Sequence, residues 1–262
     1  ALLSAGWPSS VPGMTIDRKC GSGEAAVHVA VGAIASGAAQ IMVAGGAENM
    51  SRVPMGSNRD LHGEAFGWQA LERYDLTSQG EASERMVDKW ALTREELDAF
   101  ALQSHSRAAA AADAGYFERE IVPVPIADYC EKDFDGDRGV FGYDETIRRD
   151  TSAEKLATLK TSFRPENGRI TAGNSSQISD GAAALMLMKA STAKSLGLKP
   201  RAKIRSIVTV GADPTLMLTG PIAATQSLLT KTGLTLSDID LFEVNEAFAS
   251  VPLAWLQEIG AA

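Results

Sequence analysis

Short apolar runs separated by stretches of helical periodicity form the hydrophobic pattern of this chain. An apolar run bounded by turn residues is typical of a strand. The predicted strands cover residues 14–17, 40–46, 182–188, 203–210 and 241–244. Helical spacing or richness in small residues predicts helices, most of them ending at a glycine. These cover residues 24–37, 84–90, 94–114, 191–196, 222–232 and a segment that begins at Asn245. Such alternation predicts a layered α/β fold.

Four of these segments carry further local signals. Residues 24–37 are small or apolar nearly all round the helix, which predicts burial on most sides. The run at residues 40–46 ends in two glycines and predicts a central strand, and the run at residues 182–188 predicts a buried one. Thr93 and Glu96 have the spacing of a capping box, which marks a helix start, and Gly115 suits its end.

The middle of the chain, from about Ala47 to Asn174, has a different character. Its charge rises and the alternation of strands and helices stops. Residues 133–142 are rich in Asp and Gly and predict a loop, and residues 235–240 predict a turn nearer the C-terminus. We interpret the middle region as an excursion from the main sheet.

Composition and net charge limit the kinds of partner that this protein is expected to bind. The formal net charge of −8 argues against nucleic acid, because duplex binding usually needs a basic face. No run of about 20 apolar residues occurs, so we expect no membrane span. The two cysteines, Cys20 and Cys130, do not resemble a disulfide framework, and no signal-peptide pattern opens the sequence. These features together favour a cytoplasmic protein.

Cys20 stands between a predicted strand and the start of a predicted helix, in the sequence C-G-S-G. Unpaired N–H groups and the helix dipole at such a position favour a reactive thiolate. Gly21 and Gly23 leave room for a substrate near backbone N–H groups that can bind a developing oxyanion. The alternative is a small buried core cysteine, which is the commoner role of an isolated cysteine.

Five segments in order and register extend this pattern over essentially the whole chain. They are residues 17–23 (D-R-K-C-G-S-G), 45–51 (G-G-A-E-N-M-S), 171–176 (T-A-G-N-S-S) with 180–184 (D-G-A-A-A), 213–214 with 220–221 (D-P and G-P), and 245–249 (N-E-A-F-A). Together they resemble the signature segments of the thiolase family. The resemblance implies a thiolase-like layered α-β-α-β-α fold with two similar halves and an inserted loop domain. In this division residues 1–47 and 176–198 belong to the N-terminal half, residues 48–175 form the loop domain, and residues 199–262 belong to the C-terminal half.

The resemblance also implies a mechanism. Cys20 would attack an acyl thioester and hold the acyl group, which splits one difficult step into two. Asn245 would hold a water that stabilises the enolate oxygen of a second thioester. A helix N-cap is the alternative role of Asn245.

Coenzyme A or acyl-CoA would be a substrate, with no permanently bound cofactor and no metal. By the resemblance, Arg148 lies near the nucleotide end of CoA, and Ser176 contacts the pantetheine arm beside Ala172. Apolar side chains would line the arm or the acyl pocket: Phe163, Met217 and Phe248. The alternatives are a solvated charge for Arg148 and core positions for the apolar residues. We expect a homodimer or homotetramer.

The family's catalytic Gly-His-Pro histidine and Cys-x-Gly cysteine have no counterpart in these 262 residues. His28, His62 and His105 lack the required context and are interpreted as structural, and Cys130 as incidental. We therefore expect the sequence to be a thiolase fragment that lacks both ends.

Residues 78–80 (S-Q-G) stand where acetoacetyl-specific synthetic members tend to carry His-Met-Gly, which favours degradative cleavage of 3-ketoacyl-CoA. Two other functions remain open. One is a catalytically silent thiolase-like protein that binds CoA or lipid. The other is a relative of the ketoacyl synthases, although the N-E-A-F-A motif favours a thiolase.

Overall fold

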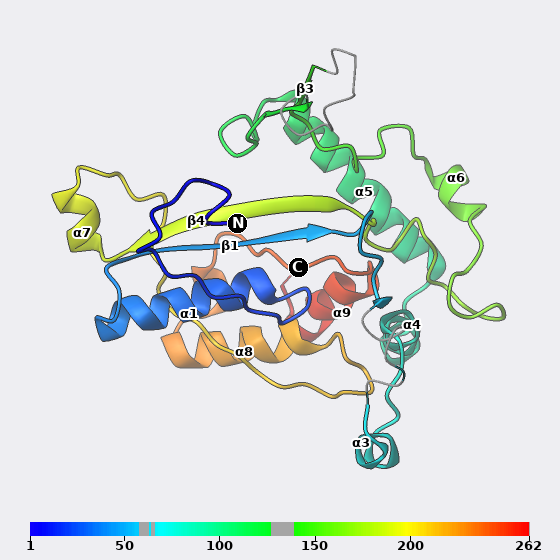
Figure 1. Cartoon of the computed structure of the whole chain (residues 1–262). Coiled ribbons are helices and arrows are strands. Elements are labelled where there is room, and N and C mark those ends of the chain that lie inside the picture. Colours follow the sequence, from blue (N-terminus) through cyan, green and yellow to red (C-terminus); the bar gives the residue numbers. More distant parts are fainter. Residues whose placement is uncertain (58–62, 64–65, 127–138, 262) are drawn as a thin grey trace. The chain divides into compact units, whose positions relative to one another are not determined.

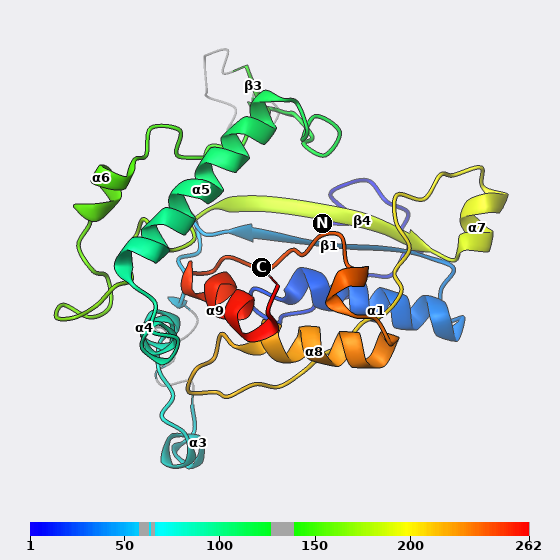
Figure 2. The same cartoon turned by 180° about the vertical axis from the view of Figure 1, so that it is seen from behind.

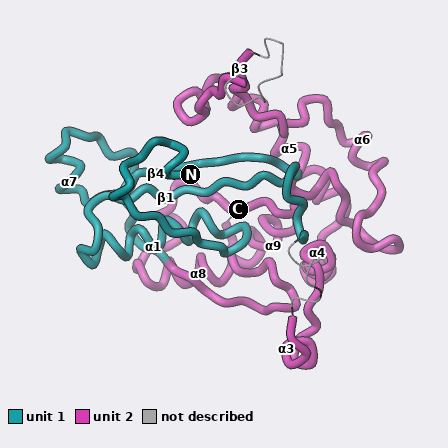
Figure 3. Tube along the Cα trace, in the orientation of Figure 1, with its two compact units in different colours: residues 1–61, 178–207 teal, residues 62–177, 208–262 magenta. Residues whose placement is uncertain are grey.

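The computed structural model describes residues 1–57, 63, 66–126 and 139–261 (Figures 1 and 2). The chain divides into two compact units (Figure 3). Unit 1 comprises residues 1–61 and 178–207, and unit 2 comprises residues 62–177 and 208–262. None of the helices within the described ranges is long and apolar enough to cross a membrane.

Unit 1 contains a two-stranded antiparallel sheet with a helix along it (Figure 1). Its elements are α1 (Ser22–Ser36), β1 (Ile41–Asn49), β4 (Asp180–Met188) and α7 (Ala190–Ser195). The register runs from Ile41 opposite Met188 to Asn49 opposite Asp180. Helix α1 ends at Gly37, whose φ of 83° suits glycine, as the sequence predicts.

Burial in unit 1 is lower than expected. The prediction that the first helix is buried on most sides is wrong, because only Ala25, Ala30 and Ile34 of α1 are buried. The predicted central strand β1 has a single partner, and the predicted buried strand β4 is mostly exposed. Within the described residues this sheet has only two strands.

Unit 2 is mainly helical. Its helices are α3 (Trp68–Arg73), α4 (Gln79–Lys89), α5 (Arg94–Asp113), α6 (Ala153–Ala157), α8 (Gly220–Thr232), the 3₁₀ turn η2 (Leu236–Asp238) and α9 (Ser250–Ile259). A short ribbon pairs β2 (Val124–Pro125) with β3 (Val140–Phe141). The capping box at Thr93 and Glu96 is confirmed at the start of α5, and Gly115 follows with a φ of 72°.

The core of unit 2 forms where α4, α5 and α9 bury their apolar sides. One cluster consists of Val87, Leu92, Leu97, Ile170, Phe248 and Ala249. A second, around Met86, Val251 and Ala254, lies between α4 and α9. Phe248 and Ala249 immediately precede α9, so the N-E-A-F-A segment is itself part of this core.

Several of the predicted elements differ from those in the structure. Residues 14–17, 203–210 and 241–244 form no strand in the described part of the chain. The last helix begins at Ser250 and not at Asn245, because residues 247–249 pair with residues 174–176. Val140–Phe141 forms a strand inside the predicted loop 133–142, whose first six residues lie outside the described ranges.

Candidate functional site

Cys20 is exposed and stands just before α1 of unit 1. The turn that precedes it is closed by two polar side chains. Asp17 accepts hydrogen bonds from the backbone N–H and the ammonium group of Lys19, at 3.0 and 2.8 Å. The Ser22 hydroxyl accepts from the backbone N–H of Arg18 at 2.8 Å and donates to the Lys19 carbonyl. These bonds hold Lys19 at a φ of 52°. They thereby fix the direction of the backbone at Cys20, the next residue.

No side chain caps α1, whose N-cap residue is Gly21. The Gly21 and Ser22 N–H groups donate to the Arg18 and Lys19 carbonyls, at 3.1 and 3.0 Å, so an outside acceptor would use N–H groups further into the first turn. A thiolate or a developing oxyanion is the kind of group that such an end stabilises.

Two of the sequence motifs pair residue by residue in the sheet of unit 1. Residues 45–49 on β1 lie opposite residues 180–184 on β4. A Cβ atom on Gly45 would come within 2.6 Å of the Ala183 carbonyl oxygen, so the strand spacing here requires glycine. A Cβ atom on Gly46 would lie 4.0 Å from the Cα atom of Gly23, which brings the start of α1 close to the same point.

Asp180 lies opposite Asn49 at one end of the paired strands and fixes that end. Its carboxylate accepts hydrogen bonds from the backbone N–H of Ser51, at 2.9 Å, and from the Ser51 hydroxyl. The hydrogen bond from the Ser51 hydroxyl is the main cause that lowers the pKa of Asp180, so the carboxylate stays ionised. Sequence reasoning placed both residues in motifs but did not anticipate this contact between them.

In unit 2, the T-A-G-N-S-S segment pairs with the N-E-A-F-A segment. The backbone N–H of Ser176 donates to the Ala247 carbonyl at 3.0 Å, and that of Ala249 donates to the Asn174 carbonyl at 2.9 Å. Ser175 and Phe248 form the bridge between these bonds. The two motifs therefore form one short antiparallel contact.

Buried carboxylates from α4 and α5 hold this segment in place. Glu84 is fully buried and accepts hydrogen bonds from the backbone N–H groups of Arg169 and Ile170, at 2.9–3.0 Å. Asp98 accepts from the Asn174 side-chain amide at 2.8 Å and from Arg94 at 2.7 Å. Sequence reasoning missed both carboxylates, since their partners lie 85 and 76 positions away along the chain.

Phe163 and Phe248 contact each other edge to face, with ring centroids 5.9 Å apart and an interplanar angle of 81°. Phe248 is buried, whereas Phe163 is 43% exposed. A Cβ atom on Gly80 would come within 2.2 Å of the Phe163 ring. The S-Q-G segment at residues 78–80 therefore lies directly against one of the predicted pocket residues.

Asn245 is exposed on the segment that precedes α9, so the alternative of a helix N-cap is wrong. Its neighbour Glu246 accepts a hydrogen bond from the Ser104 hydroxyl of α5 at 2.8 Å. The segment that carries Asn245 is thus fixed on its C-terminal side, by Glu246 and by Ala247.

The side chain of Arg148 is exposed, and its backbone N–H donates to Nδ1 of His105 at 3.1 Å. The His105 ring also faces Gln177, the residue that follows Ser176, at 3.4 Å between the two Nε2 atoms. Two predicted CoA contacts, Arg148 and Ser176, therefore lie on segments that meet at His105.

Two predicted contacts, Ala172 and Met217, remain to be placed. Ala172 is exposed on the turn between the buried Thr171 and Asn174. Met217 has a φ of 52° and lies next to Leu218, which packs against the cluster that contains Phe248. His62 and Cys130 lie outside the described residues.

The predicted site residues thus fall in both units. Cys20 lies in unit 1, and all the others lie in unit 2: Asn245, Arg148, Phe163, Ala172, Ser176, Met217 and Phe248. Within the described ranges, no group of three or more His, Cys, Asp or Glu side chains is arranged to hold a metal ion.

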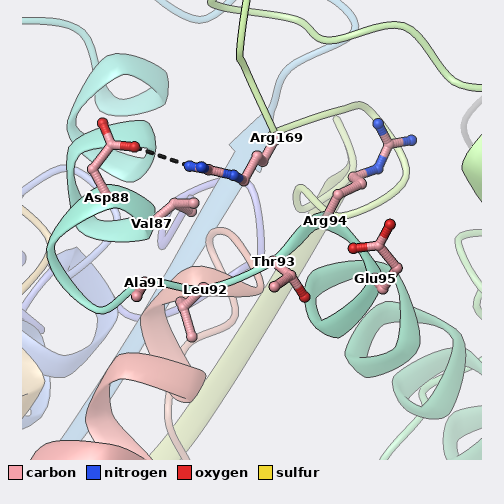
Figure 4. A pocket seen from close by; sticks show the side chains of 8 residues that line it. All are labelled: Val87, Asp88, Ala91, Leu92, Thr93, Arg94, Glu95 and Arg169. Carbon is pink, nitrogen blue, oxygen red and sulfur yellow. Dashed lines mark hydrogen bonds and ion pairs between the residues drawn. The ribbon is translucent and has the colours of Figure 1, made fainter.

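A surface hollow of about 460 Å³ in unit 2 lies apart from these residues, between the end of α4 and the start of α5 (Figure 4). Both arginines that line it are engaged within the protein. Arg169 pairs with Asp88 at 2.9 Å, and Arg94 pairs with Asp98. None of the predicted site residues lines this hollow.

Comparison with known proteins matches residues 1–191 to the N-terminal domain of thiolase and residues 198–262 to its C-terminal domain. Steroid 3-ketoacyl-CoA thiolase FadA6 of Mycobacterium tuberculosis is 46% identical over 269 residues, which cover 99% of this chain and 63% of the relative. The 3-ketoacyl-CoA thiolases of Cronobacter sakazakii and Escherichia coli are each 44% identical over 260 residues, which cover 99% of this chain and 65% of theirs. The chain therefore spans a little under two thirds of the length of these relatives.

Proposed function

The chain belongs to the thiolase family, and from that membership we propose that it acts in the thiolytic cleavage of 3-ketoacyl-CoA, with Cys20 as the nucleophile. One observation carries this proposal. The open start of α1 beside the exposed Cys20 approaches the sheet at Gly46, where the two glycine- and alanine-rich motifs pair residue by residue. Small residues at all these positions keep space around the thiol free for a substrate.

In the degradative direction the Cys20 thiolate attacks the 3-keto carbonyl carbon. The bond between C2 and C3 breaks, and its electron pair leaves on the enolate of acetyl-CoA, which takes up a proton at C2. The acyl group is now a thioester of Cys20. A second CoA loses its thiol proton and attacks this thioester, which releases the shortened acyl-CoA and restores the Cys20 thiolate. The synthetic direction is the reverse of these steps.

Two groups of this chain suit the charges that develop. Backbone N–H groups at the start of α1 suit the oxyanion that forms when Cys20 adds to the carbonyl. The Asn245 amide donates without carrying a charge, and through a water it suits the enolate oxygen. The Gly-His-Pro and Cys-x-Gly motifs do not occur in this sequence, so we assign the proton transfers to no residue of this chain.

We propose that CoA is recognised by unit 2. Arg148 carries the only formal charge among the proposed contacts and suits a phosphate of the nucleotide. Ser176 and Ala172 would lie beside the pantetheine arm. Phe163, Phe248 and Met217 would line the arm or the acyl pocket, and the edge-to-face contact of the two phenylalanines supports a shared apolar surface.

Several further features follow from family membership as proposals. They are the layered α-β-α-β-α arrangement with two similar halves and a loop domain at residues 48–175, a cytoplasmic location, and a homodimer or homotetramer. Half-exposed apolar side chains on the unit 1 sheet support assembly: Ile41, Val43, Leu185 and Met186. Light scattering on the purified protein measures the number of copies.

The function is tested by incubating the protein with a 3-ketoacyl-CoA and free CoA. Cleavage is followed by the loss of substrate, and the acyl group on Cys20 by mass spectrometry of the intact protein and its peptides. We expect an adduct on Cys20 in the wild type and in Cys130→Ala, the matched control. We expect Cys20→Ala to lose cleavage by at least about 10³-fold. Equal cleavage by Cys20→Ala and the wild type would contradict the proposal.

The same experiment separates the other two functions. Binding of CoA without cleavage or any adduct on Cys20 identifies a catalytically silent binding protein. Release of CO₂ from a malonyl thioester, without cleavage of the 3-ketoacyl-CoA, identifies a ketoacyl synthase relative.

A further inference from the structure

The half-buried ring of His105 joins two segments of unit 2 that are distant in sequence. Its Nδ1 atom accepts the backbone N–H of Arg148 at 3.1 Å. Its other ring nitrogen faces the Gln177 side-chain amide at 3.4 Å, and that amide donates to the Thr146 carbonyl at 3.1 Å. The imidazole thus connects α5 to the loop that carries Arg148, and the Gln177 amide connects that loop to the segment that carries Ser176.

Neither Arg148 nor Ser176 is fixed by a side-chain contact of its own among the contacts described above. The backbone of Ser176 is held by Ala247, and the backbone of Arg148 is held by His105. An exposed arginine on a loop has many rotamers and many loop positions, and each must be restricted when it binds a phosphate. A side chain that fixes the loop before binding reduces this cost.

We propose that His105 is a positioning residue for CoA, which holds the Arg148 loop in place before CoA arrives, while Gln177 ties the Ser176 segment to the same loop through the Thr146 carbonyl. This inference rests on the proposed function and names a residue that acts on CoA only through its neighbours. It revises the sequence interpretation of His105 as purely structural.

The charges that face the ring come from two elements besides α5. Arg148 stands on the loop after β3, and Glu246 stands on the segment before α9. Burial lowers the pKa of His105, the Arg148 charge lowers it further, and Glu246 opposes both. The ring is therefore neutral at neutral pH, and Nδ1 has the lone pair that accepts the Arg148 N–H. Protonation at low pH puts a proton on Nδ1 and removes this acceptor.

The test uses CoA itself, titrated into the folded protein by calorimetry, with four variants of the full chain. His105→Asn keeps a carbonyl oxygen near the place of Nδ1, whereas His105→Leu removes every acceptor. Gln177→Ala removes the second connection. Ser106→Ala changes an exposed neighbour on the same helix and is the matched control.

We expect His105→Leu to weaken CoA binding roughly 3- to 10-fold, as the loss of one hydrogen bond does. His105→Asn should restore most of that loss, Gln177→Ala should weaken binding in the same direction, and Ser106→Ala should bind as the wild type does. A packing role alone would not distinguish the asparagine variant from the leucine variant. If His105→Leu does not fold, Gln177→Ala and His105→Asn still carry the test.

The pH dependence gives a second readout. Lowering the pH below the usual histidine range should weaken CoA binding more in the wild type than in His105→Asn, whose side chain does not titrate. Protonation of the CoA phosphates affects both proteins equally and cancels in this comparison. Parallel pH profiles for the two proteins would overturn the inference.

Hydrogen exchange at the Arg148 amide, measured without CoA, separates failure of the inference from failure of the function. We expect faster exchange in His105→Leu than in the wild type. Wild-type protein that binds no CoA would overturn the proposed function, and the positioning role with it. Wild-type protein that binds CoA, together with a His105→Leu variant of unchanged affinity and exchange, would overturn the positioning role alone.

Discussion

The Ala183 carbonyl oxygen lies 2.6 Å from the position that a Cβ atom on Gly45 would occupy. Real Cβ atoms do not approach a backbone oxygen so closely, so the two strands meet at this spacing only because position 45 is glycine. A Cβ atom on the next residue, Gly46, would lie at an ordinary 4.0 Å from the Gly23 Cα atom. A methyl group added at Gly45 would therefore collide with the backbone of β4, whereas one added at Gly46 would make only an ordinary contact.

Gly45→Ala should destabilise the protein by about 1–3 kcal/mol, because the added methyl group pushes against backbone and not against a side chain that can turn away. Gly46→Ala is the matched control and should be close to neutral, since its methyl group meets only a van der Waals contact. Urea unfolding of both variants measures the difference. Equal stability of the two variants would count against the strand spacing described here.

Gly80→Ala should displace the Phe163 ring and cost about 0.5–1.5 kcal/mol through the loss of its edge contact with Phe248. A double-mutant cycle with Phe163→Ala tests whether this cost arises from displacement of the Phe163 ring. Once the ring is absent, the methyl group at position 80 has nothing to displace and should cost much less. Additive effects of the two substitutions would show that the methyl group acts elsewhere.

Asp98→Asn should lower the free energy of unfolding by about 2–3 kcal/mol, because the partly buried Arg94 loses its buried charged partner and the new amide can face the Asn174 amide donor. Asp113→Asn is the control, since its ion pair with Arg149 is exposed and screened by solvent. We expect a much smaller change there. Chemical denaturation of the two variants under one buffer condition compares them directly.

Acid should destabilise unit 2 through Glu81. The hydrogen bond from Arg164 lowers the pKa of Glu81 in the folded protein, so the unfolded chain binds the proton more tightly. The stabilisation is fully present above the unfolded pKa, about 4.3, and is lost as the pH falls through the lower folded value. In Arg164→Gln the melting temperature should be lower at neutral pH and should fall less on acidification. Arg149→Gln, at an exposed pair, should keep the wild-type pH profile.

Cys20 should react with iodoacetamide faster than Cys130 at neutral pH, because it is exposed beside an uncapped helix start. Cys130 follows Asp128 and precedes Glu131 and Asp133, whose negative charges disfavour a thiolate. Peptide mapping measures both rates, and acyl-CoA should protect Cys20. Faster labelling of Cys130 in a sample shown to be folded by its melting curve would argue against Cys20 as the nucleophile.

Local signals predicted the ends of several helices of this chain, although α3 and α6 were not anticipated. The capping box at Thr93 and Glu96 and the glycines that follow α1 and α8 determine helix ends through bonds between near neighbours. The segments at residues 203–210 and 241–244 have strand composition, yet a strand also requires a partner, and composition does not contain that information. Asn245 illustrates the same limit. It suits a helix start, but pairing of the following residues with residues 174–176 delays the helix to Ser250.

The candidate site, too, could be predicted only in part from the sequence. Cys20 and the glycines around it could be chosen from residue chemistry and from the order of the motifs. The pairing of the motifs, the carboxylates of Glu84 and Asp98 and the role of His105 depend on contacts between distant residues. Each of these residues has an ordinary surface or helix context in the sequence, so no local pattern distinguishes it.

The sheet beneath Cys20 has a consequence for how the protein is made. Ser51 and Asp180, which meet at one end of it, are 129 positions apart, so β1 leaves the ribosome on the order of 10 s before β4 at ordinary rates of synthesis. During that interval Ile41 and Val43 lack β4, the strand that pairs with β1 in the described part of the chain. Cys20 is thus made well before β4, which completes this pairing beside it. A nascent chain that stops before β4 carries the nucleophile without the surface that makes room for its substrate.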